Sequence, residues 1–136
     1  MHTYIETNHI VNNTKNISIK KNLFLAHAYV HTTFNNTIIT ITDIRGNTIA
    51  WSSSGVARFK GARRSTSYAA QAAAEDAGKK AMNSGVRLLR VVLKGLGQGR
   101  NSSLKGFLSV GLKVSLIADS TPVPHNGCRP PKKRRV

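Results

Sequence analysis

The sequence is poor in acidic residues, aromatic residues and cysteine. It contains 5 Asp plus Glu against 21 Lys plus Arg among 136 residues, which gives a formal net charge of +16 at pH 7. A small soluble domain usually keeps a net charge of magnitude about 2–8. A polyanionic partner is the simplest reason for such an excess of positive charge.

The scarcity of cysteine and of long apolar runs excludes further classes of protein. Cys128 is the only cysteine, so an intramolecular disulfide is excluded and a reducing compartment is indicated. No stretch of the sequence approaches the roughly 20 apolar residues that span a bilayer. No apolar helix face flanks the basic C-terminus to insert into a membrane surface. We therefore expect nucleic acid, and no membrane, as the anionic partner.

Residues 1–22 are rich in Asn, Thr, Ile and Lys. They lack the continuous apolar region of a secretory signal and contain no Arg, unlike a typical organelle presequence. We expect a native, poorly ordered N-terminal extension.

Hydrophobic alternation predicts three consecutive strands, at residues 23–33, 37–42 and 48–53. The second consists of β-branched residues only, which favour strands. Asn35-Asn36 and residues 43–47 are typical turn sequences between these strands. The three strands are therefore predicted to form an antiparallel meander.

An alanine-rich stretch predicts a long helix that ends at Asn83. Residues 65–67 offer its N-cap, and Gly85 suits a left-handed C-cap. A fourth strand is predicted at residues 86–94.

A shorter helix follows, with caps expected at residues 101–103 and an end near Val110. Gly111 ends it, and residues 112–118 are predicted to form the last strand. The expected fold class is thus α/β, with a mixed five-stranded sheet and two helices in the order β-β-β-α-β-α-β. We expect one domain at 23–119 and an extended basic tail at 120–136.

The C-terminal tail is the first candidate for binding an anion. Its last eight residues contain five cations and no acid, and Pro130-Pro131 keeps the preceding chain extended. It has too little apolar surface to fold by itself, whereas phosphates would order it by releasing counterions. Two other interpretations stay open, a solvated tail and a nuclear address signal.

A second candidate is the loop at residues 54–64, in which Arg58, Lys60, Arg63 and Arg64 surround Phe59. Arginines can bind phosphate oxygens in a bidentate manner, so the loop fits a segment that lies along a phosphate backbone. A solvated loop is the alternative. Phe59 either stacks on a base or anchors the loop by burial. Trp51 and Tyr68 are expected to serve packing.

The third candidate is Gly95-x-Gly97-x-Gly99-Arg100, which connects a strand to a helix. Glycines at such a connection let backbone amides approach an anion near the helix N-terminus. The spacing is neither that of a dinucleotide-binding loop nor that of a Walker loop. A tight structural connection is the alternative, but the neighbouring Lys94 and Arg100 favour RNA backbone binding.

Metal-ligating patterns are weak in this sequence. His27 and His31 would lie roughly 13 Å apart on one strand, too far to share a metal. His125 and Cys128 supply two ligands where structural zinc needs four. We predict no metal site.

A catalytic site would have to use the few acids. Asp43, Glu75 and Asp119 could form a two-metal nuclease site if they converged at one sheet edge. However, Asp43 and Asp119 fall at predicted element ends, and Glu75 lies mid-helix with a lysine four residues on. We predict no enzyme activity, and no cofactor or small-molecule substrate.

Several motifs occur in a familiar order and together resemble a known family. These motifs are Phe34-Asn35-Asn36-Thr37-Ile38, Thr40-Ile41-Thr42-Asp43, Gly46-Asn47, Trp51-Ser52-Ser53, Phe59-Lys60-Gly61, Ala69-Ala70-Gln71-x-Ala73-Ala74-Glu75, Lys94-Gly95-x-Gly97-x-Gly99-Arg100, and the stretch from Thr121 to Val136. The sequence from about Ala26 onward resembles the universal small-subunit ribosomal protein eleven family, of bacterial or organellar type.

The resemblance implies a ribonuclease H-like α/β fold that serves as a scaffold without nuclease activity. It implies a place on the platform of the small ribosomal subunit, near the messenger RNA exit and the E site. The partners it implies are the small-subunit rRNA and neighbouring small-subunit proteins. Carried over by position, the expected rRNA-binding residues are Asn35, Asn36, Arg58, Lys60, Arg63, Arg64, Lys94, Gly97, Gly99, Arg100, Asn126, Arg129, Lys132, Lys133, Arg134 and Arg135.

The sequence also departs from the family pattern. A usual proline of the glycine loop is replaced by Leu96 or Gln98, and Ser67-Tyr68 replaces a Thr-Pro or Ser-Pro entry to the long helix. The Asn-rich residues 1–22 replace a basic arm, while residues 47–55 and 74–82 look most like alphaproteobacterial members. Together these features predict a mitochondrial ribosome, with a bacterial cytoplasm or a plastid as alternatives.

Two functions of other classes remain open. One is a metal-dependent ribonuclease built on the same fold. The other is a free nucleic-acid chaperone that acts through its tails.

Overall fold

The computed structural model describes residues 25–136. The elements in chain order are β1 (Leu25–Thr32), β2 (Thr37–Thr42), β3 (Thr48–Ser53), η1 (Gly61–Ser65), α2 (Ser67–Asn83), β4 (Leu88–Lys94), α3 (Gly99–Val110) and β5 (Lys113–Asp119). The extension predicted at 1–22 and the start of the strand predicted at 23–33 lie outside the described residues.

The five strands form one mixed sheet in the order β3-β2-β1-β4-β5. β1, β2 and β3 are joined by short turns and pair antiparallel, as the meander prediction requires. β4 pairs parallel with β1, and β5 pairs parallel with β4, because each of them follows a helical crossover. The predicted α/β class, with a mixed five-stranded sheet and two helices, is confirmed.

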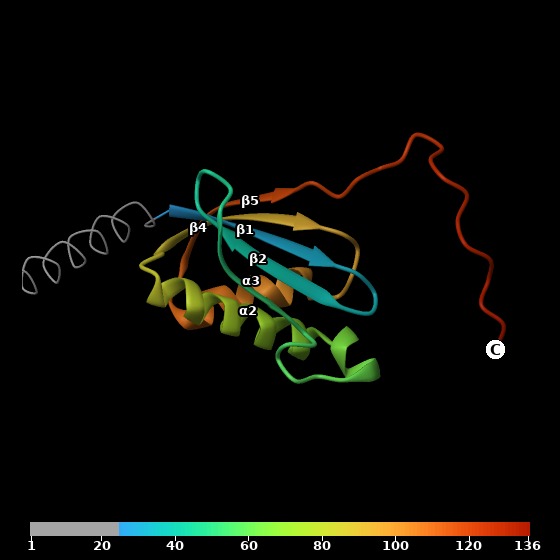
Figure 1. Cartoon of the computed structure of the whole chain (residues 1–136), viewed down its shortest axis with the longest axis horizontal. Coiled ribbons are helices and arrows are strands. Elements are labelled where there is room, and N and C mark those ends of the chain that lie inside the picture. Colours follow the sequence, from blue (N-terminus) through green and yellow to red (C-terminus); the bar gives the residue numbers. More distant parts are fainter. Residues whose placement is uncertain (1–24) are drawn as a thin grey trace, which may run out of the picture.

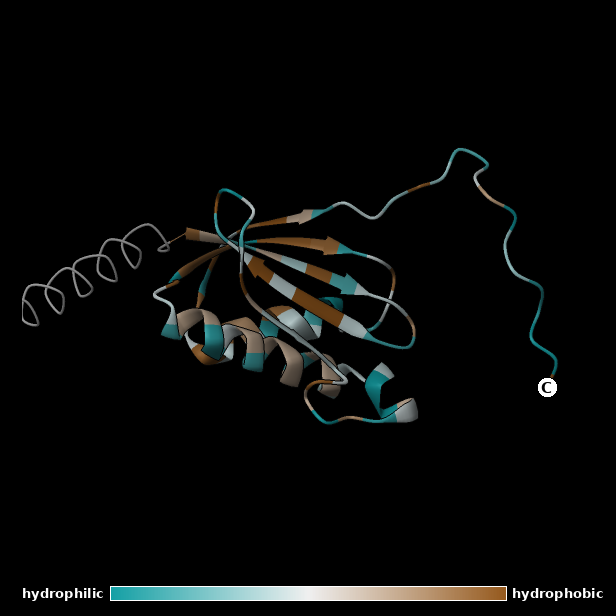
Figure 2. Cartoon of the chain, in the orientation of Figure 1, coloured by the Kyte–Doolittle hydropathy of each residue, from teal (hydrophilic) through white to brown (hydrophobic). Residues whose placement is uncertain are grey.

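Both helices cover the same face of the sheet (Figure 1). The alanines of α2 that face the sheet and α3, such as Ala73, Ala74 and Ala77, are fully buried. A Cβ at Gly106 of α3 would lie only 2.6 Å from the Ala74 Cβ, so the two helices pack almost backbone to backbone. Small side chains therefore bring both helices close to a sheet whose strands are largely apolar (Figure 2).

The other face of the sheet carries no helix, and two aromatic residues of the domain are exposed to solvent. Trp51 of β3 points to this face and is 57% exposed. Tyr68 at the start of α2 is 72% exposed, and its ring meets Phe59 edge-on at a centroid distance of 5.7 Å. Tyr68 thus packs on Phe59 at the surface of the domain, and Trp51 lies exposed on the open face of the sheet, so neither ring is part of the buried core.

The helix boundaries were predicted with mixed success. Thr66 caps α2 by accepting a hydrogen bond from the Ala69 amide at 3.2 Å, as predicted for residues 65–67. Gly85, just after the end of α2, has a positive φ of 100°, as expected for a left-handed C-cap. The prediction of a loop at 54–64 was incomplete, because residues from Gly61 onward form the short helix η1.

The predicted start of α3 is wrong. The helix begins at Gly99, and no side chain of the N-cap residue Gln98 bonds the first turn. Ser103 lies inside the helix, where its hydroxyl donates to the Gly99 carbonyl at 2.6 Å. The Asn-Ser-Ser run was misread because serine can bond back to the preceding turn within a helix as well as cap one.

Candidate nucleic-acid interface

One end of the sheet brings together the segments that were separate in the sequence. β1, β4 and β5 are mutually parallel and all end there, β2 begins there, and β3 ends there. A hydrogen bond of 3.1 Å from the Ser54 amide to the Thr37 carbonyl ties the loop after β3 to the start of β2. We name this region the loop end and define it as residues 33–36, 54–66, 94–100 and 119–121. It lies at the right of the domain in Figure 1.

The turn between β1 and β2 is held by its own polar side chains. The Thr33 amide donates to the Asn36 carbonyl at 2.9 Å, and the Asn36 side-chain oxygen accepts from the Thr37 amide at 2.9 Å. The Asn36 oxygen is therefore occupied in shaping the turn, whereas the neighbouring Asn35 is exposed. Phe34 is 72% exposed beside them, a feature that the sequence reading did not single out.

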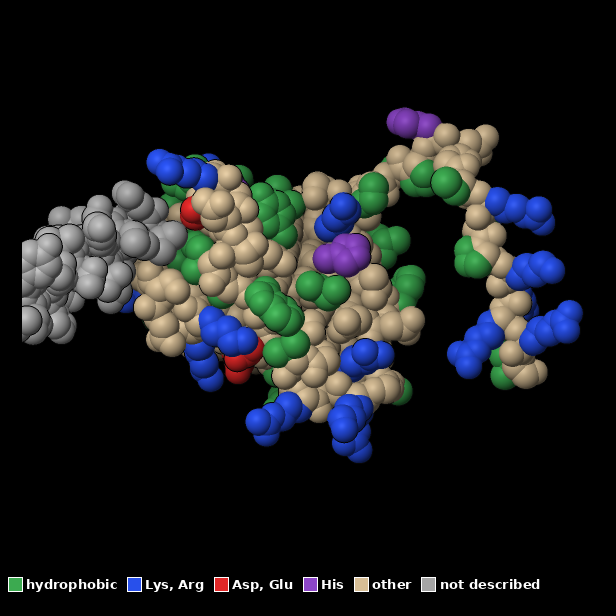
Figure 3. Space-filling model, viewed as in Figure 1, with side chains coloured by type: hydrophobic (Ala, Val, Ile, Leu, Met, Phe, Trp, Pro, Cys, Tyr) green, Lys and Arg blue, Asp and Glu red, His purple; other side chains and the backbone are tan. Residues whose placement is uncertain are grey.

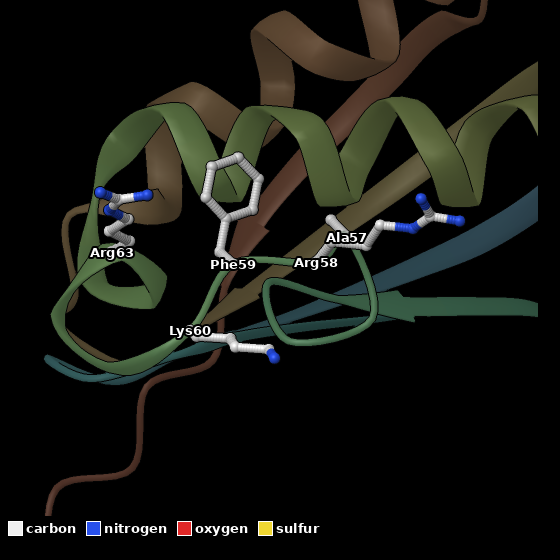
Figure 4. A pocket seen from close by; sticks show the side chains of 5 residues that line it. All are labelled: Ala57, Arg58, Phe59, Lys60 and Arg63. Carbon is white, nitrogen blue, oxygen red and sulfur yellow. The ribbon is translucent and has the colours of Figure 1, made fainter.

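The second part of the loop end is the basic loop before α2. Its four cations, Arg58, Lys60, Arg63 and Arg64, are all exposed. Arg58 adopts a positive φ of 70°, which is unusual for a residue with a side chain. Figure 4 shows the side chains of Arg58, Lys60 and Arg63 spread around the loop rather than gathered on one point. Such a spread suits several phosphates of a backbone better than one bound anion.

A hollow of about 390 Å³ lies in this loop and is lined by Ala57, Arg58, Phe59, Lys60 and Arg63. Phe59 is half-buried and points toward α2 (Figure 4). Its ring packs against Tyr68, with an interplanar angle of 80°. This geometry favours the loop-anchor interpretation of Phe59, and it leaves the hollow bounded mainly by cations.

The glycines of the connection between β4 and α3 are required for packing. Gly95 has a positive φ of 101°, and a Cβ at this position would collide with the Thr32 carbonyl oxygen. A Cβ at Gly97 would collide with the Thr33 carbonyl, and a Cβ at Gly99 would collide with the Thr37 hydroxyl. The connection therefore packs backbone to backbone on the turn after β1, as the structural alternative predicted. Gly97 and Gly99 are buried by this contact, whereas Lys94 beside them is exposed.

The Arg100 side chain forms hydrogen bonds with other groups of this chain. Its guanidinium donates to Asp119 Oδ2 at 2.7 Å, to the Gly95 carbonyl at 2.8 Å and to the Thr121 hydroxyl oxygen at 3.3 Å. The Thr121 hydroxyl donates in turn to Asp119 Oδ1 at 2.6 Å. Bonds from Thr121 and Arg100 hold the pKa of the Asp119 carboxyl well below its usual range. The sequence reading missed this network, because residues 95, 100 and 119–121 come together only in the folded sheet.

The C-terminal tail leaves the domain from this network. It extends away from the body of the molecule in Figure 1, and every residue from Pro122 to Val136 is exposed. Figure 3 shows Lys and Arg side chains along the tail with no acidic side chain among them. Asn126 has a positive φ of 65°, which places a turn between the two prolines of the first half and the basic run.

Two helix N-termini also lie at the loop end. α2 begins directly after η1, and a Cβ at Gly99, the first residue of α3, would meet both Thr37 and Ala70 of α2. Each helix N-terminus carries a partial positive charge, because its first backbone amides have no partner within the helix. The helix ends thus add to the positive potential of the exposed cations.

The carboxylates that a nuclease would need do not converge. Asp43 lies in the turn after β2, at the end of the sheet opposite Asp119, and accepts hydrogen bonds from Asn47. Glu75 accepts from Gln71 and Ser109, and Asp119 is engaged by Arg100. Within residues 25–136 there is no group of three His, Cys, Asp or Glu side chains that could hold a metal ion. The nuclease hypothesis fails on this geometry.

The described helices are also too short or too polar to cross a membrane. Fold and surface together define a small, strongly basic α/β protein in which five exposed cations gather at one end of the sheet and five more lie in one extended tail.

Comparison with known proteins identifies the family. The family described as ribosomal protein S11 matches residues 26–135, so the chain belongs to the ribosomal protein S11 family. The small ribosomal subunit protein uS11 of Parvibaculum lavamentivorans is 59% identical over 117 residues, which are 86% of this chain and 91% of that protein. The proteins of the same description from Bordetella pertussis and Bordetella avium are each 58% identical over 118 residues, 87% of this chain and 89% of theirs. The resemblance drawn from the motifs is confirmed.

Proposed function

We propose that this protein is a structural component of the small ribosomal subunit that binds rRNA through the loop end and the C-terminal tail. Membership of the ribosomal protein S11 family supports a place in the ribosome and a structural role rather than an enzymatic one. The platform of the subunit, near the messenger RNA exit and the E site, is the position that we propose for it. Neighbouring small-subunit proteins are the other proposed partners.

The observation that carries the proposal is the convergence of exposed cations from distant parts of the chain. Arg58, Lys60, Arg63 and Arg64 come from one loop, and Lys94 comes from the end of β4. They share one end of the domain with two helix N-termini and with the start of a tail that carries five further cations. An RNA backbone offers a phosphate for each of them, and neutralising these phosphates releases counterions.

The expected rRNA-binding residues divide into two groups by their surroundings. The exposed group contacts RNA directly and consists of Asn35, Arg58, Lys60, Arg63, Arg64, Lys94, Asn126, Arg129, Lys132, Lys133, Arg134 and Arg135. The second group is at least half-buried and shapes the surface that RNA meets; it consists of Asn36, Gly97, Gly99 and Arg100. Phosphate contacts position the protein, and the amides of Asn35 and Asn126 add neutral hydrogen bonds.

The test is a salt titration of binding to a platform rRNA fragment. Each phosphate contact contributes about 0.7–0.9 to the slope of log affinity against log salt concentration. Truncation after residue 125 removes five cations, so we expect the slope to fall by about 3.5–4.5. An unchanged slope would show that the tail does not bind phosphates.

Stoichiometry separates a structural component from a free chaperone. A structural component sediments with small subunits at one copy per subunit through a high-salt wash. Loss of the protein from the subunits under that wash would favour the chaperone function.

We further propose that the ribosome in question is mitochondrial. The support is the Asn-rich stretch at 1–22, which replaces the basic arm of the family, together with the likeness to an alphaproteobacterial relative. Sedimentation of the protein with small subunits from purified mitochondria of the source cells is the expected result. Recovery with plastid ribosomes or with bacterial cytoplasmic ribosomes would contradict it.

A further inference from the structure

The face of the sheet opposite the helices has a pattern that lies, apart from Lys94 at its margin, outside the proposed rRNA interface. Cross-strand neighbours place one residue of each strand in a row across the whole sheet, and the row reads Trp51, Thr40, Tyr29, Val92 and Ala118. None of the five side chains is charged. Neighbouring strands lie about 4.8 Å apart, so the row is about 19 Å long.

One cation and one histidine flank this uncharged row on each side. His27 and Arg90 are paired neighbours on one side of it, and His31 and Lys94 are paired neighbours on the other. The next residues along the strands add Ile38 and Leu116, which are 43% and 54% exposed. Among the strand residues that the structure describes, no Asp or Glu points to this face. Asp119 pairs with Leu93, whose buried side chain points to the helices, and it is engaged by Arg100 of α3 on that side.

The exposure of the aromatic residues on this row is unusual for a monomer. Tyr29 is 44% exposed and Trp51 57% exposed, and they lie on strands separated only by β2. Scattered apolar side chains on a surface need no explanation, but an ordered row on a flat sheet face is typical of a protein-binding site. Aromatic residues at the centre of such a row provide large contact areas.

We propose that this open sheet face binds an amphipathic segment of a neighbouring small-subunit protein, with apolar residues along its centre and acidic residues on its flanks. The partner lies in the same subunit, so the inference rests on the proposed function. Charge complementarity fixes the chemistry of the segment, because cations stand on both sides of the row without acids among them. A helix of about 13 residues matches the length of the row.

An RNA strand fits this face less well. The two aromatic rings are two strands, or about 9.6 Å, apart, with the small Thr40 between them. Successive stacked bases need closer platforms than that. The uncharged centre also offers no phosphate contact, whereas the loop end carries five exposed cations.

The direct test is a photo-cross-linker, p-benzoylphenylalanine, placed at position 29 of the full-length protein and assembled into small subunits. The expected result is a cross-link to one protein, within a segment that combines apolar and acidic residues. The same cross-linker at Lys79, which is exposed on the helix side, serves as the control. Cross-links to rRNA, to residues 1–24 of the same chain, or to no defined segment would overturn the proposal.

A double substitution separates this inference from rRNA binding. Trp51→Ser with Arg90→Glu removes an apolar contact and reverses one flanking charge, and neither residue belongs to the proposed rRNA interface. We expect affinity of the free protein for the rRNA fragment to change by less than about threefold, since one distant charge is altered. Retention in salt-washed subunits should fall at least tenfold. Normal retention of this variant in the subunits would contradict the docking face. The proposed rRNA binding is tested separately, by the salt slope of the variant truncated after residue 125.

The only tryptophan of the chain gives a second readout that does not depend on folding defects. 5-Fluorotryptophan incorporated at position 51 reports the environment of this face by ¹⁹F NMR. The resonance should stay unchanged when the rRNA fragment binds and should shift when the stripped small-subunit proteins are added. A shift with rRNA alone would overturn the proposal.

Discussion

Arg100 and Asp119, 19 residues apart in the sequence, form an ion pair with a distance of 2.7 Å between Nη2 and Oδ2. The pair joins the first turn of α3 to the last residue of β5, where the basic tail begins. Arg100 also binds the Gly95 carbonyl, so the glycine connection, the helix and the tail share one network. An arginine that the motif marks as a phosphate ligand thus orients the segment that carries the other cations.

The first prediction concerns the pH dependence of this network. The pKa of Asp119 is held below its ordinary value of 3.8 in the folded protein, so the carboxylate stabilises the fold above that pH. This stabilisation is lost as the pH falls below the ordinary value toward the lower folded pKa. Urea unfolding should therefore show Asp119→Asn to be less stable than the unmodified protein at about pH 7, with the difference shrinking toward about pH 2. A difference that is constant across this range would contradict the assignment.

The second prediction compares two glycines that both have a positive φ. Gly95→Ala should destabilise the protein by roughly 2–4 kcal/mol, because a methyl group there meets the Thr32 carbonyl in addition to backbone strain. Gly46→Ala should cost only about 1 kcal/mol, since its φ of 92° is strained but nothing lies within 4 Å. Urea unfolding of both variants measures the two costs. Equal costs would show that the close approach at Gly95 does not matter.

The third prediction concerns the loop before α2. Arg63→Gln with Arg64→Gln removes two exposed cations, so the salt slope of rRNA binding should fall by about 1.4–1.8. The control is Lys79→Gln with Lys105→Gln, which removes the same charge from the helix side of the domain. Equal effects of the two pairs would mean that the protein binds through its net charge and not through the loop end.

The fourth prediction concerns the contact between β3 and α2. The buried Ser52 hydroxyl donates to Asp76 Oδ2 at 2.8 Å, and Lys80 donates to the same oxygen at 2.8 Å. Partial burial raises the pKa of Asp76, but the hydrogen bonds from Lys80 and Ser52 together with the positive charges of Lys80 and Lys79 outweigh it, and the net pKa is lowered.

Asp76→Ala should destabilise the protein by about 1–3 kcal/mol, because it leaves the Ser52 hydroxyl buried without a partner. Adding Ser52→Ala to that variant should recover part of the loss, which a double-mutant cycle by urea unfolding would measure. Strictly additive losses would show that the two side chains are not coupled.

The order of elements followed from local patterns. β-Branched alternation marked the strands, alanine content marked α2, and Thr66 and Gly85 marked its two ends. These signals are local, because each depends on a side chain and its neighbours within a turn or two. The start of α3 was misjudged for the same reason, since a serine can cap a helix or bond back inside it, and only the packing of Gly99 decides between the two.

The candidate site was predicted as residues but not as a surface. The basic loop, Lys94 and the tail were recognised by charge, yet their convergence depends on β4 pairing beside β1 rather than at the edge of the meander. The inward direction of Arg100 likewise depends on where β5 ends.

By itself the sequence determined the fold class, the excess of positive charge and the family, because these depend on composition, periodicity and motifs. Only the tertiary structure decided which cations remain free, why the three glycines are required, and that Trp51 and Tyr29 stand on an open face. Those properties depend on contacts between residues far apart in the chain, such as Thr32 and Lys94, which are 62 residues apart and come together only when the strands pair.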